Sequence, residues 1–158
     1  RIGILMPNIG KNVCNLKLMH GNEIIFSFSQ FIGKNIILYF YPKDNTRSCT
    51  QEAKDFTSLK SEFDNLNTII IGVSTDSNQT HDKFIAKYNL KLKLLSDVDN
   101  TLCEYFDIWV EKNMYGKKFM GIERSTFLIN TSGIIIKEWR KVKVNGHAEM
   151  LLETVKEL

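Results

Sequence analysis

Two long apolar runs separated by a helical pattern constrain this chain more than any other feature. Residues 35–42 read NIILYFYP and residues 68–74 read TIIIGVS, and both runs are rich in β-branched or aromatic side chains. Such runs are typical of strands that are covered on both faces. Between them, apolar residues from position 50 to position 66 recur at steps of three and four, which predicts an amphipathic helix. Strand, helix and strand in this order predict a βαβ unit with a parallel pair.

The remaining patterns complete a mixed sheet with helices on both faces, so we expect one α/β domain over residues 1–158. Alternating runs and turn residues predict strands, whereas steps of three and four predict helices. The segment 109–121 has two glycines and clustered lysines, and is expected to be a loop. The other expected elements are an N-terminal hairpin at 15–28, a helix at 78–88, a short strand at 92–97, a short helix at 99–106, a second hairpin at 123–140 and a final helix at 147–158.

Composition argues against several classes of function. The chain has 21 Lys and Arg against 18 Asp and Glu, a net charge of only +3, and scattered basic residues, so a nucleic-acid partner is not expected. No apolar run approaches the ~18 to 20 residues that span a bilayer, and residues 1–13 do not resemble a secretory signal. The sequence starts at Arg1 without a methionine, which leaves open whether residues precede it. Three cysteines are too few for a disulfide framework, so the expected compartment is the reducing cytoplasm.

Cys49 occupies a position where a thiolate can be stabilised. Counting back from Ala53, it lies one turn earlier on the inward face of the predicted helix, near the end where backbone N–H groups lack partners. These groups and the helix dipole both favour the charged form of the sulfur. Thr46 could place a hydroxyl beside the sulfur, and Pro42 fixes the chain as it leaves the strand.

The residues around Cys49 distinguish it from the other two cysteines. Five polar residues precede it at positions 44–48, and Thr50 follows it, which is unusual for a buried core cysteine. Cys14 and Cys103 lie in apolar patterns, and free cysteines in such patterns are usually small, inert core residues. We therefore expect chemistry at Cys49 and packing roles for Cys14 and Cys103.

The segment Pro42-Lys43-Asp44-Asn45-Thr46-Arg47-Ser48-Cys49 matches the PxxxTxxC motif of peroxiredoxins. The wider sequence FYPKDNT…CTQEA resembles the bacterioferritin comigratory protein branch, and so do LLSDVDN, FDIWVEKNMYGKKFMGIERSTFLI and KVKVNGHAEMLLETVKEL. This similarity runs in order through nearly the whole chain. It implies a thioredoxin-like fold and a thiol-dependent peroxidase, without a cofactor, that reduces hydrogen peroxide and organic hydroperoxides through a cysteine sulfenic acid.

The resemblance also implies a role for each residue of the site. Cys49 corresponds to the peroxidatic cysteine, Thr46 to the motif threonine that orients the peroxide, and Pro42 to the proline that shields the sulfur. Arg124 corresponds to the arginine that completes the site, with a permanent charge and several N–H donors. Glu52 is left with three options: binding Arg124, binding another basic group, or capping the helix start.

The chain departs from the branch before and after Cys49. Arg47 and Ser48 replace the proline and glycine that commonly precede the cysteine, so the stiffness of the loop and its reach to substrate are expected to differ. Lys54 stands where many members have a second, resolving cysteine, and the region 84–86, where another variant carries it, has none.

These departures favour a cycle with one cysteine. An external thiol would then reduce the sulfenic acid, and the resemblance implies thioredoxin, a glutaredoxin or glutathione for this role. The alternative is an internal disulfide with Cys103 after local unfolding of the first helical turn, which needs the two Cα atoms within about 7 Å.

Other readings of the cysteines and histidines are weaker. No CxxC or HxxxH spacing links Cys14, Cys49, Cys103, His20, His81 and His147, so no metal site is expected. A Cys-His hydrolase would need His81 or His147 at Cys49. A non-enzymatic peroxide sensor or holdase of thioredoxin fold would use the same activated thiolate, and only turnover would separate it from a peroxidase. The resemblance implies a monomer.

Overall fold

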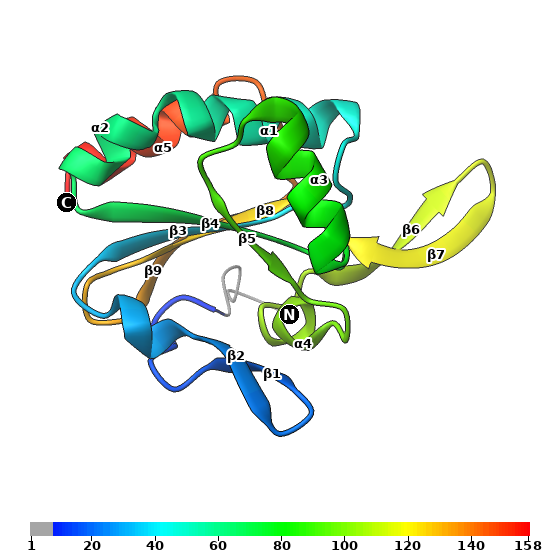
Figure 1. Ribbon diagram of the computed structural model, residues 1–158, viewed down its shortest axis with the longest axis horizontal. Coiled ribbons are helices and arrows are strands. Elements are labelled where there is room, and N and C mark those ends of the chain that lie inside the picture. The colour runs from blue at the N-terminus through cyan, green and yellow to red at the C-terminus, as the bar shows by residue number, and fades with distance from the viewer. Residues whose placement is uncertain (1–7) are drawn as a thin grey trace, which may run out of the picture.

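A five-stranded mixed sheet forms the centre of the protein in the computed structural model, which describes residues 8–158 (Figure 1). The strand order is β5-β4-β3-β8-β9; β3, β4 and β5 are parallel, while β8 and β9 run antiparallel. The bounds are Asn35–Phe40 for β3, Thr68–Ser74 for β4, Lys93–Ser96 for β5, Ser125–Ile129 for β8 and Ile135–Trp139 for β9. The predicted βαβ unit and the second hairpin are therefore confirmed.

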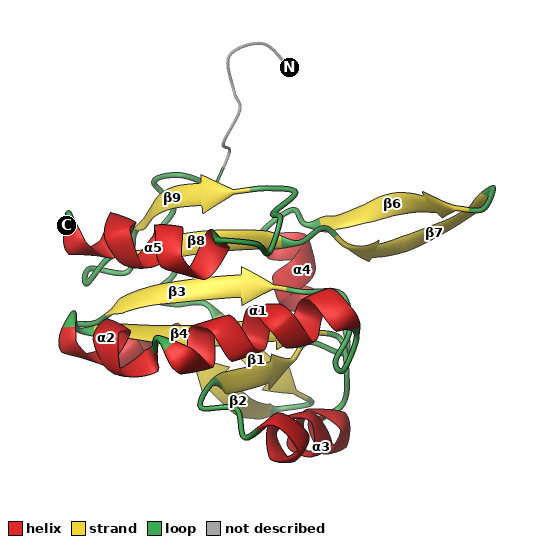
Figure 2. Ribbon diagram, turned by 90° about the horizontal axis from the view of Figure 1, so that it is seen from above, coloured by secondary structure: helices red, strands yellow, loops and turns green. Residues whose placement is uncertain are grey.

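Each face of the sheet has its own hydrophobic core. On one face lie α1, α2, α3 and α5, at Arg47–Ser58, Lys60–Asn65, Asn78–Tyr88 and His147–Lys156 (Figures 1 and 2). On the other lie the N-terminal hairpin, a short 3₁₀ helix and α4, at Lys17–His20 (β1), Glu23–Ser27 (β2), Phe28–Phe31 (η1) and Thr101–Tyr105 (α4). Along β3, Ile37 and Tyr39 enter the first core and Ile36, Leu38 and Phe40 the second. This alternation is the reason for the continuously apolar run.

The helix expected at 50–66 is two helices. α1 starts earlier, at Arg47, and ends at Ser58, and α2 begins at Lys60. The break lies at Leu59, where the hydroxyl of Ser58 donates to the backbone oxygen of Asp55 at 2.8 Å. Hydroxyl side chains that bond nearby carbonyl groups compete with the helical ladder, which accounts for the interruption.

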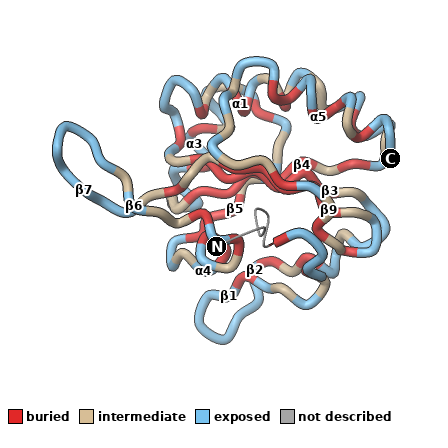
Figure 3. The backbone as a smooth tube through the Cα atoms, turned by 180° about the vertical axis from the view of Figure 1, so that it is seen from behind, coloured by how far each residue is buried: buried red, intermediate tan, exposed pale blue. Residues whose placement is uncertain are grey.

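The prediction of a loop at 109–121 is wrong. Strands β6 (Trp109–Met114) and β7 (Lys117–Ile122) form an antiparallel hairpin that projects from the body and is largely exposed (Figures 1 and 3). Tyr115 and Gly116 both have positive φ, at 53° and 79°, as a two-residue hairpin turn of type I′ requires. Exposure of both faces removes the apolar alternation by which a strand is normally predicted.

No helix within residues 8–158 has both the length and the apolar character needed to cross a membrane.

Candidate active site

Cys49 lies where the central strand passes into the first helix. β3 ends at Phe40, the connection 41–46 follows, and Cys49 is the third residue of α1. Its side chain packs in the core between the sheet and the helices, and only 2% of the residue is exposed. The first N–H groups of a helix lack intrahelical partners, and Cys49 stands in this first turn of α1.

Arg124 contacts the sulfur from the opposite part of the chain. It lies between β7 and β8, directly before Ser125, and Ser125 pairs with Phe40 at the end of β3. The register therefore brings Arg124 to the same end of the sheet as Cys49. Its Nη2 donates to Cys49 Sγ at 3.4 Å.

Glu52, one turn after Cys49 on α1, binds the other arm of the Arg124 guanidinium. Arg124 Nη1 donates to Glu52 Oε1 at 2.6 Å, and Glu52 is 2% exposed. Of the three options left by the sequence, the structure shows the pairing with Arg124. The helix cap is Thr46.

Burial shifts the pKa values of both Glu52 and Arg124. Burial raises the pKa of Glu52 to about 7, against the opposing effect of the Arg124 charge. The second carboxyl oxygen, Oε2, is buried and has no hydrogen-bond partner among residues 8–158. Burial alone would lower the pKa of Arg124, but the facing groups Glu52 and Cys49 raise it, so the guanidinium stays charged.

Thr46 and Pro42 flank this group without bonding to the sulfur. The Thr46 hydroxyl donates to the backbone oxygen of Lys43 at 2.9 Å, and its side chain makes no capping bond to α1. Because the hydroxyl proton is used in that bond, its lone pairs are left to accept from another group. Pro42 is half-buried in the same connection. The structure thus brings Cys49 and Arg124 into contact and leaves Thr46 and Pro42 beside them.

The other two cysteines lie far from this site, and all three are free. Cys103 is fully buried in the core on the other face of the sheet, and burial raises the pKa of its thiol, followed by the effect of Asp97. Cys14 was expected in a core and is only half-buried; its Sγ donates to the backbone oxygen of Ser132 at 3.3 Å, because it lies in a turn before β1. Ser132 follows the end of β8 that lies away from Cys49.

The described histidines that a hydrolase would require are bonded elsewhere. His147 Nε2 and the Thr126 hydroxyl are 2.8 Å apart, and burial followed by the Arg124 charge lowers the pKa of His147 to about 4. His81 contacts Asp44 and Leu95. Neither histidine has a hydrogen bond to Cys49 in the described part of the chain.

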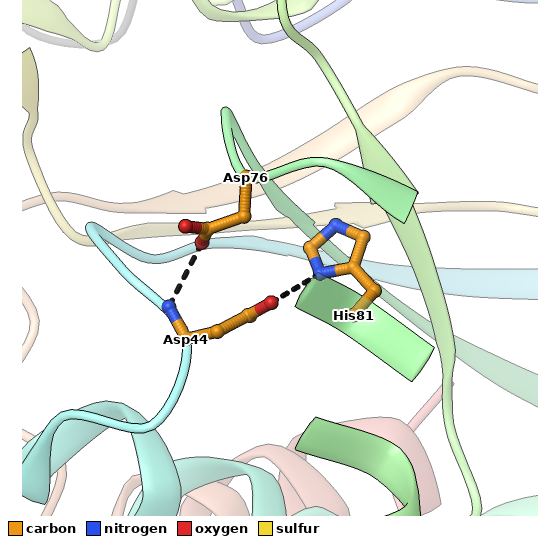
Figure 4. A group of neighbouring side chains, drawn as sticks. All are labelled: Asp44, Asp76 and His81. Atoms are coloured by element: carbon orange, nitrogen blue, oxygen red, sulfur yellow. Dashed lines mark hydrogen bonds and ion pairs between the residues drawn. The ribbon is translucent and has the colours of Figure 1, made fainter. Parts of the chain in front are cut away.

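Asp44, Asp76 and His81 form a cluster that sequence reasoning missed (Figure 4). One ligand atom from each lies within 4.8 Å of the others, a spacing that a metal ion could bridge. Asp44 Oδ1, however, already accepts from the Tyr41 hydroxyl, and Oδ2 is hydrogen-bonded to His81 Nδ1, so both carboxyl oxygens have protein partners. A signal was present in the sequence: His81 precedes Phe84, Ile85 and Tyr88 on the inward stripe of α3, and a polar residue in such a position needs a buried partner.

Comparison with known proteins places the chain in a family. Residues 9–138 match the AhpC/TSA family. Peroxiredoxin Bcp of Bacillus subtilis is 48% identical over 150 residues, which cover 95% of this chain and 96% of the relative. Peroxiredoxin Bcp of Xanthomonas campestris is 51% identical over 124 residues, 78% of each chain.

Solved structures agree in fold with these relatives. A PrxQ mutant of Xylella fastidiosa has a TM-score of 0.86 at 42% identity and covers 95% of this chain and 96% of its own. The bacterioferritin comigratory protein of Xanthomonas campestris has a TM-score of 0.80 at 47% identity over 84% of each chain. The predicted thioredoxin-like fold is therefore confirmed. The chain belongs to the AhpC/TSA family and is a peroxiredoxin, a thiol-dependent peroxidase, of the bacterioferritin comigratory protein branch.

Proposed function

We propose that Cys49 is the peroxidatic cysteine and that it reduces hydrogen peroxide and organic hydroperoxides. The observation that carries this proposal is the 3.4 Å hydrogen bond from Arg124 to Cys49 Sγ in a buried site at a helix start. A permanent cation and free backbone donors at a sulfur favour the thiolate, which is the nucleophilic form.

The proposed step is a displacement on oxygen. The Cys49 thiolate attacks the terminal oxygen of ROOH, an S–O bond forms, and the O–O bond breaks. The leaving RO⁻ takes up a proton and departs as ROH, while the sulfur is oxidised to sulfenic acid. Arg124 and the first N–H groups of α1 are the donors that stabilise the charge on the leaving oxygen, and the Thr46 hydroxyl accepts from the peroxide. Pro42 keeps water from the sulfur.

The recovery step is proposed to use an external thiol. One thiol condenses with the Cys49 sulfenic acid and releases water, and a second thiol displaces Cys49 and leaves as a disulfide. Support comes from Cys103, which lies in the core on the opposite face of the sheet, and from Cys14, at the far end of β3. Thioredoxin, a glutaredoxin or glutathione could supply the thiols. The family resemblance implies that the protein acts as a monomer, and we propose this state for the present chain.

A relative supports the inclusion of organic peroxides. The structure of the Xanthomonas campestris bacterioferritin comigratory protein is described as giving insight into its alkyl peroxide reduction activity. At 47% identity, we extend this substrate class to the present chain as part of the proposal.

The test is peroxide consumption with a thiol-recycling system. Cys49→Ser should abolish turnover, whereas Cys14→Ser, at the half-buried thiol remote from the site, should retain it. Peroxide consumption that persists in Cys49→Ser would refute the proposed nucleophile. Oxidation of the wild type only once per molecule, with every reductant tried, would favour the sensor or holdase.

A further inference from the structure

The turn that precedes Cys49 is held by a buried ion pair. Asp44 is 5% exposed, and its two carboxylate oxygens have different partners. Oδ1 accepts from the Tyr41 hydroxyl at 2.6 Å, and Oδ2 lies 2.6 Å from Nδ1 of His81. His81 lies on α3, and only 3% of its side chain is exposed. The carboxylate therefore has protein partners in place of water.

The surroundings of the His81 ring determine where its protons are. Nε2 lies 2.9 Å from the backbone oxygen of Leu95, which can only accept, so Nε2 carries a proton. Nδ1 faces the carboxylate of Asp44, which also accepts from Tyr41. Burial, first of all, raises the pKa of Tyr41, so the phenol stays protonated and continues to donate. Burial opposes a charged ring, but Asp44 and the Leu95 carbonyl raise the pKa of His81, so below that pKa the ring is an imidazolium that donates through both nitrogens.

Two further bonds fix the same turn. The backbone N–H of Asp44 donates to Asp76 Oδ2 at 2.8 Å (Figure 4). The next residue, Asn45, has a left-handed backbone with φ 61°, and its side-chain oxygen accepts from the Tyr88 hydroxyl at 2.8 Å. α3 thus binds this turn through two residues, His81 in its first half and Tyr88 at its end.

The position of this turn determines where the Thr46 hydroxyl and the Cys49 sulfur lie. The backbone oxygen of Lys43 accepts from the Thr46 hydroxyl, and Thr46 is the cap residue of α1. The backbone oxygen of Thr46 accepts from Thr50, so the first helical turn, which contains Cys49, starts from this residue. A shift of the turn would therefore move both the hydroxyl and the sulfur.

We propose that His81 is a positioning residue of the peroxidase site: as a buried imidazolium paired with Asp44, it holds the 42–46 turn and thereby Thr46 and Cys49. The catalytic meaning of this inference rests on the proposed function of Cys49. The pairing itself does not depend on that function.

The pair is sensitive to pH in a defined direction. Burial lowers the pKa of His81, but Asp44, the Leu95 carbonyl and Asp76 outweigh burial and raise it above 6.5. The pair therefore stabilises the turn fully below about pH 6.5 and loses this effect as pH rises through the folded pKa of His81. Once Nδ1 is deprotonated, its lone pair faces the carboxylate. The groups that face the ring are the Asp44 carboxylate, Asp76 and, on β5, the backbone carbonyl of Leu95. The Tyr41 hydroxyl is bonded to the other oxygen of the Asp44 carboxylate.

Two variants separate position from charge. His81→Leu removes both donors and leaves the Asp44 carboxylate unpaired. Asp44→Asn keeps the geometry with a neutral ring, because the amide can donate to Nδ1 while Nε2 still donates to Leu95. Asp82→Asn, which changes a neighbouring exposed carboxylate on α3, is the matched control.

The experiment measures the rate of Cys49 oxidation by hydrogen peroxide and the rate of its alkylation by iodoacetamide, from about pH 6 to 9. His81→Leu should slow oxidation about tenfold, because the nucleophile Cys49 is displaced from its position. It should speed alkylation, because the buried sulfur becomes accessible. In the wild type, alkylation should rise more steeply as pH passes through the folded pKa of His81, because the pair is lost there. Asp44→Asn should stay within about threefold of the wild type in both rates and should lack this additional rise. Asp82→Asn should match the wild type.

Nitrogen NMR of the wild-type ring tests the pairing without any variant. Protons on both His81 nitrogens at pH 6 are expected, and a ring with one unprotonated nitrogen would overturn the inference. Wild-type oxidation and alkylation rates in His81→Leu would overturn it as well. If peroxide does not oxidise Cys49 in the wild type, the proposed function fails, while the alkylation and NMR results still decide on the ion pair.

Discussion

Arg124 serves two acidic groups with one planar side chain. Nη1 binds Glu52 and Nη2 binds Cys49, so the pair with Glu52 aims the guanidinium at the sulfur. A lysine has a single ammonium and could not reproduce this fork. Glu52 also offsets part of the positive charge that favours a thiolate. Its protonation state therefore matters to the site. Its Oε2 is buried and has no hydrogen-bond partner among the residues that the structure describes, which makes the charged form costly.

The raised pKa of Glu52 predicts a loss of stability with rising pH. The folded protein holds this proton up to about pH 7, whereas an unfolded chain releases it near 4.5. Stability from this group is complete below about pH 4.5 and is lost as pH rises through 7, with a magnitude of about 3 kcal/mol. In Glu52→Gln the group does not titrate. Urea unfolding at pH 4.5 and 8 should therefore show a larger decrease in the wild type than in the variant, and equal decreases would contradict this account.

At the scale of elements, the β6–β7 hairpin and the central strands behave differently. The central strands are buried on both faces, but the hairpin meets the body only at its base, where Ile122 is buried. Its outer part therefore depends on its own turn and ladder. The Tyr115-Gly116 turn, with both φ values positive, is the part that a substitution can disturb most directly.

Gly116→Val should loosen the hairpin without disturbing the site. A β-branched residue at φ 79° is strained by about 1 to 3 kcal/mol, so amide exchange in β6 and β7 should accelerate about tenfold or more. Lys118→Val, in the ordinary strand geometry of β7, is the control. The rate of Cys49 oxidation should stay unchanged in both. Unchanged exchange in Gly116→Val would show that the turn does not hold the hairpin.

At the scale of the whole molecule, sequence predicts the layers better than the contacts between distant segments. The apolar runs of β3 and β4 and the stripe that ends at Cys49 are local patterns, and they predicted the βαβ unit. The contact between Arg124 and Cys49 depends on β8 pairing with β3, which no local pattern specifies; only the family resemblance indicated it. The Asp44–His81 pair joins segments 37 residues apart by the same kind of tertiary packing. The hairpin was missed because both of its faces are exposed.

The sheet also separates the three thiols. Cys49 lies in one core and Cys103 in the other, and Cys14 is bonded beyond the far end of β8. The far end of β8 pairs with Ile36, and the end near Cys49 pairs with Phe40, so the two ends are four residues of about 3.3 Å each apart along β3. An internal disulfide would require the chain to reorganise across or along the sheet, so a Cys49 sulfenic acid should persist until an external thiol arrives.

The most direct test is to treat the reduced protein with one equivalent of hydrogen peroxide in the presence of dimedone, which traps sulfenic acids, and to map the cysteines by mass spectrometry. We expect a dimedone adduct on Cys49, with Cys14 and Cys103 still free to react with an alkylating agent. A disulfide between Cys49 and Cys103 or Cys14, or trapping at a cysteine other than Cys49, would contradict it.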